Sequence, residues 1–261
     1  MSELPNALAL KRADSIERLW LLGLVTPAML LIVITMVLPV GWLFYLSLLS
    51  DTGAFTTEHY VRMWEQPSYF RTFRTTFEVS IMTTAICLVI GYPLAYFLSE
   101  LPKRAANLCM IAVLLPLWTS LLVRTYAWLV LLQRKGLINN WAIELGLWTE
   151  PIALVHNMLG TLIGTVHVML PFLILPLYSS MRAIDRNYLR AAANLGASPM
   201  KTFWSVFFPL AMPGMATGAL IVFILCLGFY ITPAVLGGGK VIMVSSRIAN
   251  DIEIFFNWGA A

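Results

Sequence analysis

Long uninterrupted runs of apolar residues dominate the pattern along this chain. Four of these runs contain no Asp, Glu, Lys or Arg, and they cover residues 19–50, 79–99, 151–181 and 202–239. A fifth run, 105–132, contains a single charged residue, Arg124. A helix needs about 20 apolar residues to cross roughly 30 Å of hydrocarbon. The pattern therefore predicts five membrane-spanning helices, at about 20–46, 76–98, 105–132, 155–177 and 206–231.

Prolines and glycines within the apolar runs indicate where these helices bend. We expect kinks at Pro27 and Pro39 in the first span and a bend near the end of the second span, at residues 91–93. Pro116 lies near the middle of the third span. The fold class is all-α, a polytopic bundle of transmembrane helices.

Five spans leave no room for a second folded domain in 261 residues. We divide the chain into a polar tail, 1–18, and one transmembrane domain, 19–261. The segment 252–258 is apolar and aromatic, like the approach to another span. We expect a sixth helix that is missing or truncated, and a genuine five-span protein is the alternative.

Composition agrees with a membrane location. The chain is 59% hydrophobic and 11% charged, with a mean hydropathy of +0.80, whereas soluble domains carry about 25% charged residues. An ordinary soluble enzyme is thereby excluded. The net charge of +4 fits basic cytoplasmic loops better than nucleic-acid binding. Three cysteines inside apolar stretches are expected to be buried hydrophobes.

The distribution of Lys and Arg predicts the orientation. If the N-terminus is cytoplasmic, the segments 1–18, 100–104 and 182–201 face the cytoplasm. These have a higher density of basic residues than the opposite segments 51–78, 134–150 and 240–253. We therefore expect a cytoplasmic N-terminus.

The polar segment 182–205 is the most informative part of the chain. Asp185 is a good N-cap for a helix over 186–195, and Gly196 suits the left-handed residue that ends such a helix. Pro199 fits the first turn of a restarted helix. The helix should lie at the cytoplasmic surface, where three consecutive alanines form a thin face. From composition alone, a simple connector and a docking element for a partner are equally good interpretations.

The residue order favours docking. Residues 190–209 read RAAANLGASPMKTFWSVFFP, which resembles the cytoplasmic loop motif of permease subunits of binding-protein-dependent ABC importers. That motif is Glu-Ala-Ala, three residues, Gly, nine residues, then Ile-x-Leu-Pro. Ala191, Ala192, Gly196 and Pro209 stand at the matching positions. Arg190 replaces the motif's Glu, which casts doubt on any specific ionic contact from that position.

The resemblance implies that the segment 182–205 contains the coupling helix, which sits in a cleft of the ATPase subunit. It assigns this coupling role to Asp185, Tyr188, Leu189, Arg190, Ala191, Ala192, Leu195, Gly196, Ala197, Pro199 and Pro209. No catalytic residue and no metal site are expected. The chain would have no ATPase activity and no cofactor of its own, because ATP is bound by the partner subunit.

Four further segments resemble the spermidine/putrescine branch of this family. They read GYPLAYFLS in the second span, LLPLWTSLLVRTYAWLVLL in the third, LPFLILPLYSSM in the fourth and LGFYITPAVLGGG after the fifth. The resemblance implies a six-span core in the bacterial inner membrane and import of a small solute, most simply a polyamine. The implied partners are two ATPase copies, a second permease, a periplasmic or extracellular binding protein and the lipid bilayer.

Polar and aromatic groups in the spans are candidates for the translocation path, namely Glu78, Trp118, Arg124, Tyr126, Trp128 and Tyr230. Aromatic faces can bind ammonium groups, although interfacial belts account for many such residues. Arg124 either faces a partner, a cavity or a carboxylate, or snorkels to the outer interface. Glu78 is either a counter-charge for a polyamine or for Arg124, or a solvated carboxylate at a helix start.

His156 and His167 lie on the expected fourth span, three helical turns apart and nearly on one face. Two histidines without a third ligand make a poor metal site. We interpret them as interhelical hydrogen-bonding groups or as residues lining the mouth of the path.

Two other function classes are weighed against the importer. A stand-alone secondary transporter or channel would need acidic residues deep in the membrane or inverted repeats, and neither is visible in the sequence. An intramembrane enzyme would need a nucleophile–base or metal constellation. His167 with Ser80 or Ser120 could supply one, but no motif supports it.

Overall fold

The computed structural model describes residue 17 and residues 20–50 and 53–261. The chain forms two compact units: Met1–Glu65 with Asp251–Ala261, and Gln66–Asn250. In the described residues, helices account for all regular structure apart from an isolated β-bridge between Leu49 and Phe55. The all-α fold class is confirmed.

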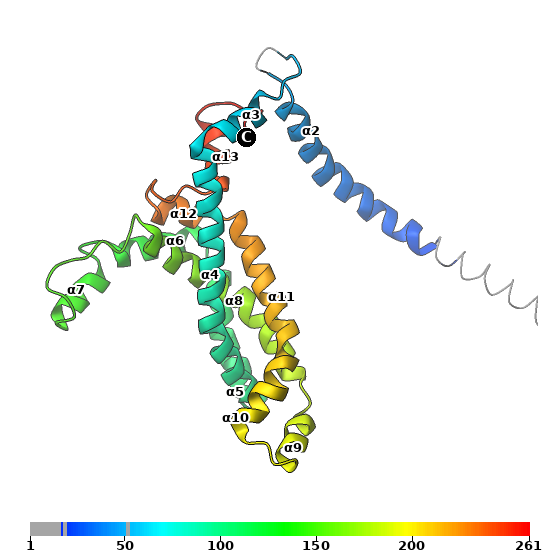
Figure 1. Ribbon diagram of the computed structural model, residues 1–261, viewed down its shortest axis with the longest axis vertical. Helices are drawn as coiled ribbons and strands as arrows, with labels where there is room; N and C mark the ends of the chain where they lie inside the picture. Colours follow the sequence, from blue (N-terminus) through cyan, green and yellow to red (C-terminus); the bar gives the residue numbers. More distant parts are fainter. Residues whose placement is uncertain (1–16, 18–19, 51–52) are drawn as a thin grey trace, which may run out of the picture. The chain divides into compact units, whose positions relative to one another are not determined.

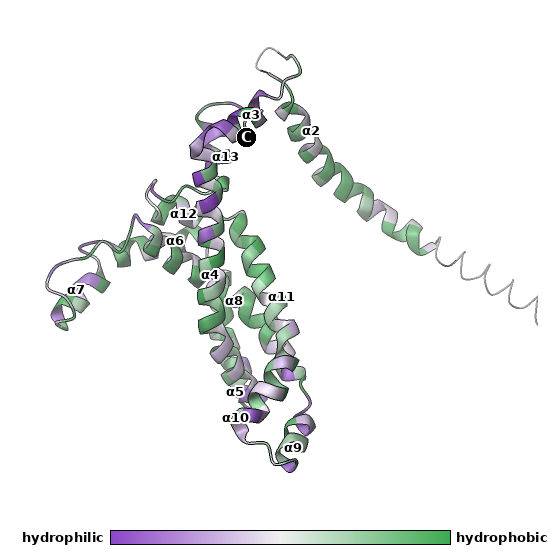
Figure 2. Cartoon of the chain, viewed as in Figure 1, coloured by the Kyte–Doolittle hydropathy of each residue, from purple (hydrophilic) through white to green (hydrophobic). Residues whose placement is uncertain are grey.

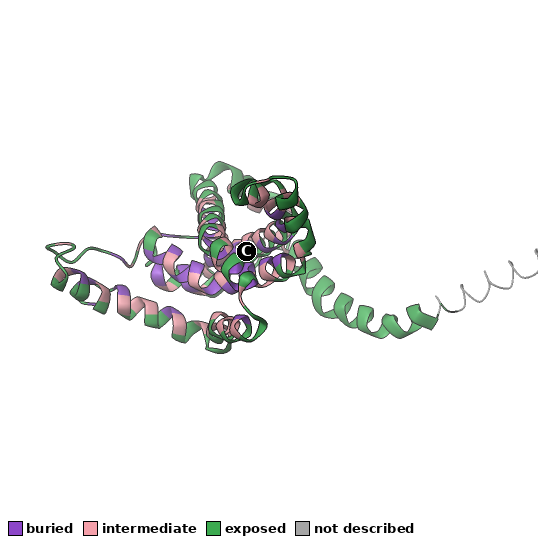
Figure 3. Ribbon diagram, turned by 90° about the horizontal axis from the view of Figure 1, so that it is seen from below, coloured by how far each residue is buried: buried purple, intermediate pink, exposed green. Residues whose placement is uncertain are grey.

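The smaller unit contains one long apolar helix, Trp20–Ser47. It includes a π-helical segment, η1 (Val33–Val37), and then α2 (Leu38–Ser47). No side chain of this helix is buried (Figure 3). The helix is continuous through both of its prolines. Pro27 lies in its α-helical part, and the π-helical segment immediately precedes α2, which contains Pro39. Pro39 has no backbone N–H to donate to a hydrogen bond. The π-helical segment before it changes the local backbone hydrogen-bond pattern of the helix. A short amphipathic helix, α3 (Glu58–Glu65), follows.

Three long helices form the core of the larger unit: α4 (Pro67–Glu100), α8 (Met158–Ala183) and α11 (Phe208–Leu227). They lie side by side in Figure 1. Their shared core includes the fully buried side chains of Cys87, Leu173 and Val222. Small residues allow the close approach of helices in membranes. A Cβ atom on Gly218 of α11 would lie 2.9 Å from the backbone oxygen of Leu173 on α8.

The expected third span is not one continuous helix. It consists of α5 (Lys103–Leu114), the 3₁₀ segment η2 (Leu115–Trp118) and α6 (Leu121–Leu132), followed by α7 (Leu137–Glu144). The axes of Lys103–Trp118 and Leu121–Glu144 differ by 95°. The predicted third span is therefore sharply bent, just after Pro116. The chain leaves the helical conformation at Thr119 and Ser120, which are both extended in ψ, and restarts at Leu121.

The boundaries of other spans also differ from those predicted. The helix predicted from about residue 76 begins at Pro67, and α4 continues through the expected bend at 91–93 to Glu100. The expected fifth span gains an N-terminal extension. It is made of α10 (Pro199–Thr202) and the π-helix η3 (Phe203–Phe207), so the whole helix covers Pro199–Leu227. The described residues contain four helices long and apolar enough to span a membrane, or five if the bent pair is one span.

Two shorter helices complete the larger unit at the end opposite α9 and α10. Thr125 of α6 hydrogen-bonds Thr232 of α12 (Ile231–Leu236), with 3.2 Å between the hydroxyl oxygens. The first residue of α13 (Val244–Glu253) donates its N–H to the Thr76 hydroxyl at 2.9 Å. Figure 2 shows apolar residues along α8 and α11 and polar residues around α9 and α10. A truncated sixth span stays a prediction.

Candidate functional site: the coupling segment and its seat on α4

The helix predicted around the three alanines is α9 (Arg186–Asn194), and its caps are those expected. The Asp185 carboxylate accepts a hydrogen bond from the backbone N–H of Asn187 at 2.9 Å. At the other end, Gly196 has a φ of +82°. The N–H groups of Gly196 and Ala197 donate to the carbonyls of Ala193 and Ala192. This is the Schellman arrangement, which favours glycine at the left-handed position.

The helix restarts two residues later, as predicted. The Ser198 hydroxyl accepts from the N–H of Lys201, and Pro199 occupies the first turn of α10. Pro209 lies in the first turn of α11, just after η3. The end of α9 and the Ser198-capped start of α10 therefore flank the turn at Gly196. The sharp change of direction after α9 is encoded by these local caps.

One side of α9 and of its following loop faces away from the protein. No residue of α9 is buried, and Tyr188, Leu195 and Met200 are 59%, 88% and 68% exposed. Exposed apolar side chains of this size mark interaction surfaces. Arg190, Ala191 and Ala192 lie on this short helix and are exposed or half-buried with them. The predicted coupling residues thus include a thin, partly apolar outer surface.

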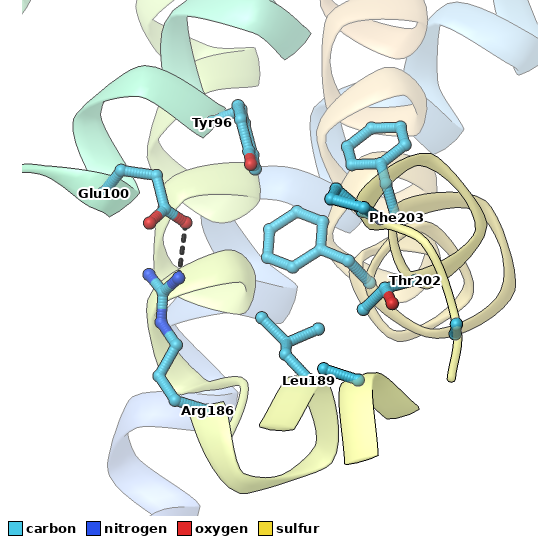
Figure 4. Close-up of a pocket in the computed structure, with 10 residues that line it drawn as sticks. Tyr96, Glu100, Arg186, Leu189, Thr202 and Phe203 are labelled. Carbon is cyan, nitrogen blue, oxygen red and sulfur yellow. Dashed lines mark hydrogen bonds and ion pairs between the residues drawn. The ribbon is translucent and has the colours of Figure 1, made fainter. Parts of the chain in front are cut away.

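The other side of the segment covers a cavity of about 380 Å³ against the end of α4 (Figure 4). Leu189, Ala197 and Pro199 of the predicted set line it. The remaining lining residues are Tyr96, Glu100, Arg186, Ala193, Thr202, Phe203 and Phe207. Arg186 forms an ion pair with Glu100, with 2.5 Å between Nη1 and Oε1. This pair joins the first residue of α9 to the last residue of α4.

An aromatic layer lies beside the cavity, toward the membrane spans. The Tyr96 ring packs edge-on against Phe203 and Phe207, with centroids 5.6 and 5.1 Å apart. Tyr92 contacts Phe203 and Phe208 in the same layer. Neither this layer nor the Glu100–Arg186 pair was predicted from the sequence. Two patterns in the sequence could have indicated the layer: the four-residue spacing of Tyr92 and Tyr96, and the aromatic residues within 203–208.

The candidate path residues do not form one cluster. Glu78 pairs with Arg74 on its own helix, with 2.7 Å between Oε1 and Nε. Trp118 and Tyr126 are 87% and 54% exposed, and Tyr230 is the N-cap residue of α12. Glu78 is thus the counter-charge of a neighbouring arginine one turn away.

Trp128 and His167 do form an interhelical contact. The indole N–H donates to Nδ1 of His167 at 3.0 Å, which links α6 to α8. Arg124 lies on the same helix as Trp128. Two of the Arg124 guanidinium nitrogens, Nε and Nη1, are buried and find no hydrogen-bond partner in the described part of the chain. The interhelical interpretation of His167 is confirmed.

His156 does not lie on the fourth span. The helix begins at Met158, and His156 precedes it with a φ of +61°. Its backbone N–H donates to the carbonyl of Leu236, so it belongs to the loop packed against α12. No group of three or more potential metal ligands occurs among residues 17, 20–50 and 53–261.

Comparison with known proteins identifies the family. A model of the binding-protein-dependent transport system inner membrane component matches residues 16–259. The chain belongs to this family. It is a multi-pass permease subunit of an ABC importer of the inner membrane, and in this family the ATPase is a separate subunit.

Curated relatives with similar sequences include polyamine permeases. The spermidine/putrescine permease PotB of Haemophilus influenzae is 36% identical over 78% of this chain and 71% of its own length. PotB of Escherichia coli is 34% identical over 79% and 76%. A molybdenum permease, ModB of Azotobacter vinelandii, is 32% identical over 69% and 79%. Among these relatives, the permease is therefore most similar to the PotB proteins.

Solved structures agree with the fold. A chain of a bacterial ABC transporter that imports alginate superposes with a TM-score of 0.74, at 15% identity, over 96% of this permease and 90% of that chain. A second structure, of an alginate transporter with its periplasmic protein bound, gives 0.75 over 95% and 88%. The ABC importer permease fold predicted from the sequence is confirmed.

Proposed function

We propose that this permease imports a polyamine, such as spermidine or putrescine, as one subunit of an ATP-driven complex. The observation that carries the proposal is the 34–36% identity to PotB proteins over more than three quarters of the chain. The permease would form part of the path. A binding protein at the periplasmic surface would deliver the solute, and a second permease would complete the path.

In this proposal the energy enters through α9. Two ATPase subunits bind ATP on the cytoplasmic side, and one of them receives the exposed surface of α9, with Tyr188 and Leu195 in its cleft. The N-terminus is cytoplasmic, so α9 and the α4–α5 turn face the ATPase. Closure of the ATPase pair on ATP shifts the permeases from an inward-open to an outward-open state. Different affinities for the solute in the two states couple the steps.

Retention of the ATPase tests the coupling role. The tagged permease is co-expressed with the ATPase and the second permease encoded beside it and purified in detergent. Gly196→Asp should abolish ATPase retention, because it adds bulk, charge and left-handed strain on the docking surface. Gly146→Asp is the matched control. Gly146 also has a positive φ, +70°, with open space around it, but follows α7, far along the chain from α9.

Retention of ATPase by the native chain and Gly146→Asp, with loss in Gly196→Asp, supports the proposal. A folded native chain that retains no ATPase contradicts it.

Solute uptake tests the polyamine assignment. The complete complex is reconstituted in vesicles with its binding protein, and ATP-dependent uptake of labelled spermidine and putrescine is compared with that of molybdate. Uptake of polyamines but not of molybdate supports the assignment. Uptake of molybdate alone would overturn the solute while leaving the ABC permease role intact.

A further inference from the structure

The coupling segment, residues 182–205, contacts α4 at both of its ends. The last carbonyls of a helix have no partner within the helix, and α4 ends at Glu100. Arg182, at the end of α8, donates through one Nη1 atom to two carbonyls of this terminus, Ser99 at 2.8 Å and Leu101 at 3.1 Å. A cation at this position also complements the negative end of the helix dipole.

Arg186 adds a second attachment one turn further on. Its Nη1 atom pairs with the Glu100 carboxylate, and its Nη2 atom donates to the Ser99 carbonyl at 3.2 Å. Arginine suits this arrangement because its planar fork presents several donors in fixed directions. Each contact is partly exposed, and a lone exposed pair holds weakly. Here, however, two arginines converge on three consecutive residues of α4 and its cap.

The far end of the segment meets α4 through the aromatic layer. Phe203 and Phe207 of η3 pack against Tyr96, one turn before the end of α4. Between the two attachments, the middle of the segment lies over the cavity (Figure 4). On the inner side of α9, Leu189 packs against the core cluster that includes Ala95 and Leu98 of α4. A displacement of α9 therefore reaches α4 through this contact, through the arginines and through the aromatic rings.

We propose that Arg182 and Arg186 form a latch that makes α4 move with α9, so that ATPase closure is transmitted to the spans through α4. The inference rests on the proposed docking of α9 to the ATPase. Both arginines are positioning residues, since their guanidinium groups are engaged with the end of α4. Loss of the latch should leave the subunits assembled and the ATPase active. ATP hydrolysis should then drive less transport.

The test measures transport per ATP hydrolysed in the reconstituted complex, with labelled spermidine as the probe. We expect Arg186→Gln and Glu100→Gln each to lower this ratio about fivefold or more, a typical scale for a coupling between sites. Subunit retention and basal ATP hydrolysis should be unchanged. Arg71→Gln is the matched control, because Arg71 is an exposed arginine near the start of α4, outside the coupling segment, and takes no part in the ion pair with α9.

A charge exchange and a conservative variant separate the latch from simple structural support. Glu100→Arg combined with Arg186→Glu should recover part of the ratio that either single reversal loses, and Arg186→Lys should retain more than Arg186→Gln. Native ratios in Arg186→Gln and Glu100→Gln, or no recovery in the exchanged pair, would overturn the latch. Loss of ATPase retention in Arg186→Gln would also overturn it, since the residue would then serve docking. A native chain that binds no ATPase would refute the proposed docking instead.

Discussion

At the scale of single residues, the approach of α8 and α11 depends on glycine. A Cβ atom on Gly218 would meet the backbone oxygen of Leu173 at 2.9 Å and Pro176 Cγ at 3.2 Å. A backbone atom in a packed helix cannot move aside as a flexible side chain can. We expect Gly218→Ala to destabilise the larger unit by about 1–3 kcal/mol, a typical cost of overpacking.

Thermal unfolding of the purified permease in detergent measures this effect. Gly41→Ala is the control, because Gly41 is also helical, and a Cβ atom added there would meet nothing within 4 Å beyond the backbone of its own helix. The control should melt at the native temperature or slightly above it, since alanine favours helix. Equal melting temperatures for the two variants would contradict close packing at Gly218.

The Trp128–His167 hydrogen bond allows a second residue-scale prediction. Interhelical hydrogen bonds in membranes contribute about 0.6 kcal/mol on average and up to about 1.7. A double-mutant cycle with Trp128→Phe and His167→Phe should give a coupling free energy within this range, because each substitution removes the same contact between α6 and α8. Unfolding free energies of the four proteins supply the measurement. Strictly additive effects would mean that the bond contributes nothing.

How well single residues could be predicted depended on how local their roles are. Asp185 and Gly196 act on backbone atoms within five residues, so their types and spacing were sufficient to predict both caps. Glu100 and Arg186 meet across 86 positions. A single sequence does not show which two surface charges so far apart along the chain will pair. The contact between the coupling segment and the end of α4 was therefore not predicted.

At the scale of elements, the break between α5 and α6 shows what hydropathy cannot resolve. An apolar run of sufficient length fits either one straight helix or two shorter helices, because both bury similar surfaces. The deciding feature is local: extended backbone at Thr119 and Ser120. Prolines at 93, 171, 176 and 213 sit inside continuous helices. Proline alone was thus a poor guide to where a helix breaks in this protein.

Spin-label distances test the bend. Labels on Leu108→Cys and Val130→Cys, both at exposed positions, in a background without the three native cysteines, would be about 33 Å apart along a straight helix at 1.5 Å per residue. A 95° bend shortens this to roughly 22 Å. We expect the shorter distance, and expect it to persist in Pro116→Ala, because the break follows at Thr119 and Ser120. A distance near the longer value would restore the continuous span.

At the scale of the whole molecule, the long helices of the larger unit occur in the order in which the spans were predicted, and their ends meet as that order requires. The ends of α4 and α8 and the start of α9 meet through the Glu100–Arg186 and Ser99–Arg182 contacts. The beginning of α6 meets α12 through Thr125 and Thr232, at the other end of the unit. Alternating apolar runs and polar loops were sufficient to predict this order. The orientation in the membrane rests on Lys and Arg density alone.

Single-cysteine labelling tests that orientation. The cysteine-free permease carries either Leu195→Cys, beside the coupling helix, or Leu145→Cys, after α7, at positions 88% and 75% exposed. Arg186 at the start of α9 pairs with Glu100 at the α4–α5 turn. A label beside α9 therefore reports on which side of the membrane both segments lie. We expect a membrane-impermeant maleimide to modify Leu145→Cys in spheroplasts and Leu195→Cys only in inverted vesicles. The reverse pattern would place α9 outside, where no ATPase could reach it. It would thereby remove the basis of both the docking surface and the latch.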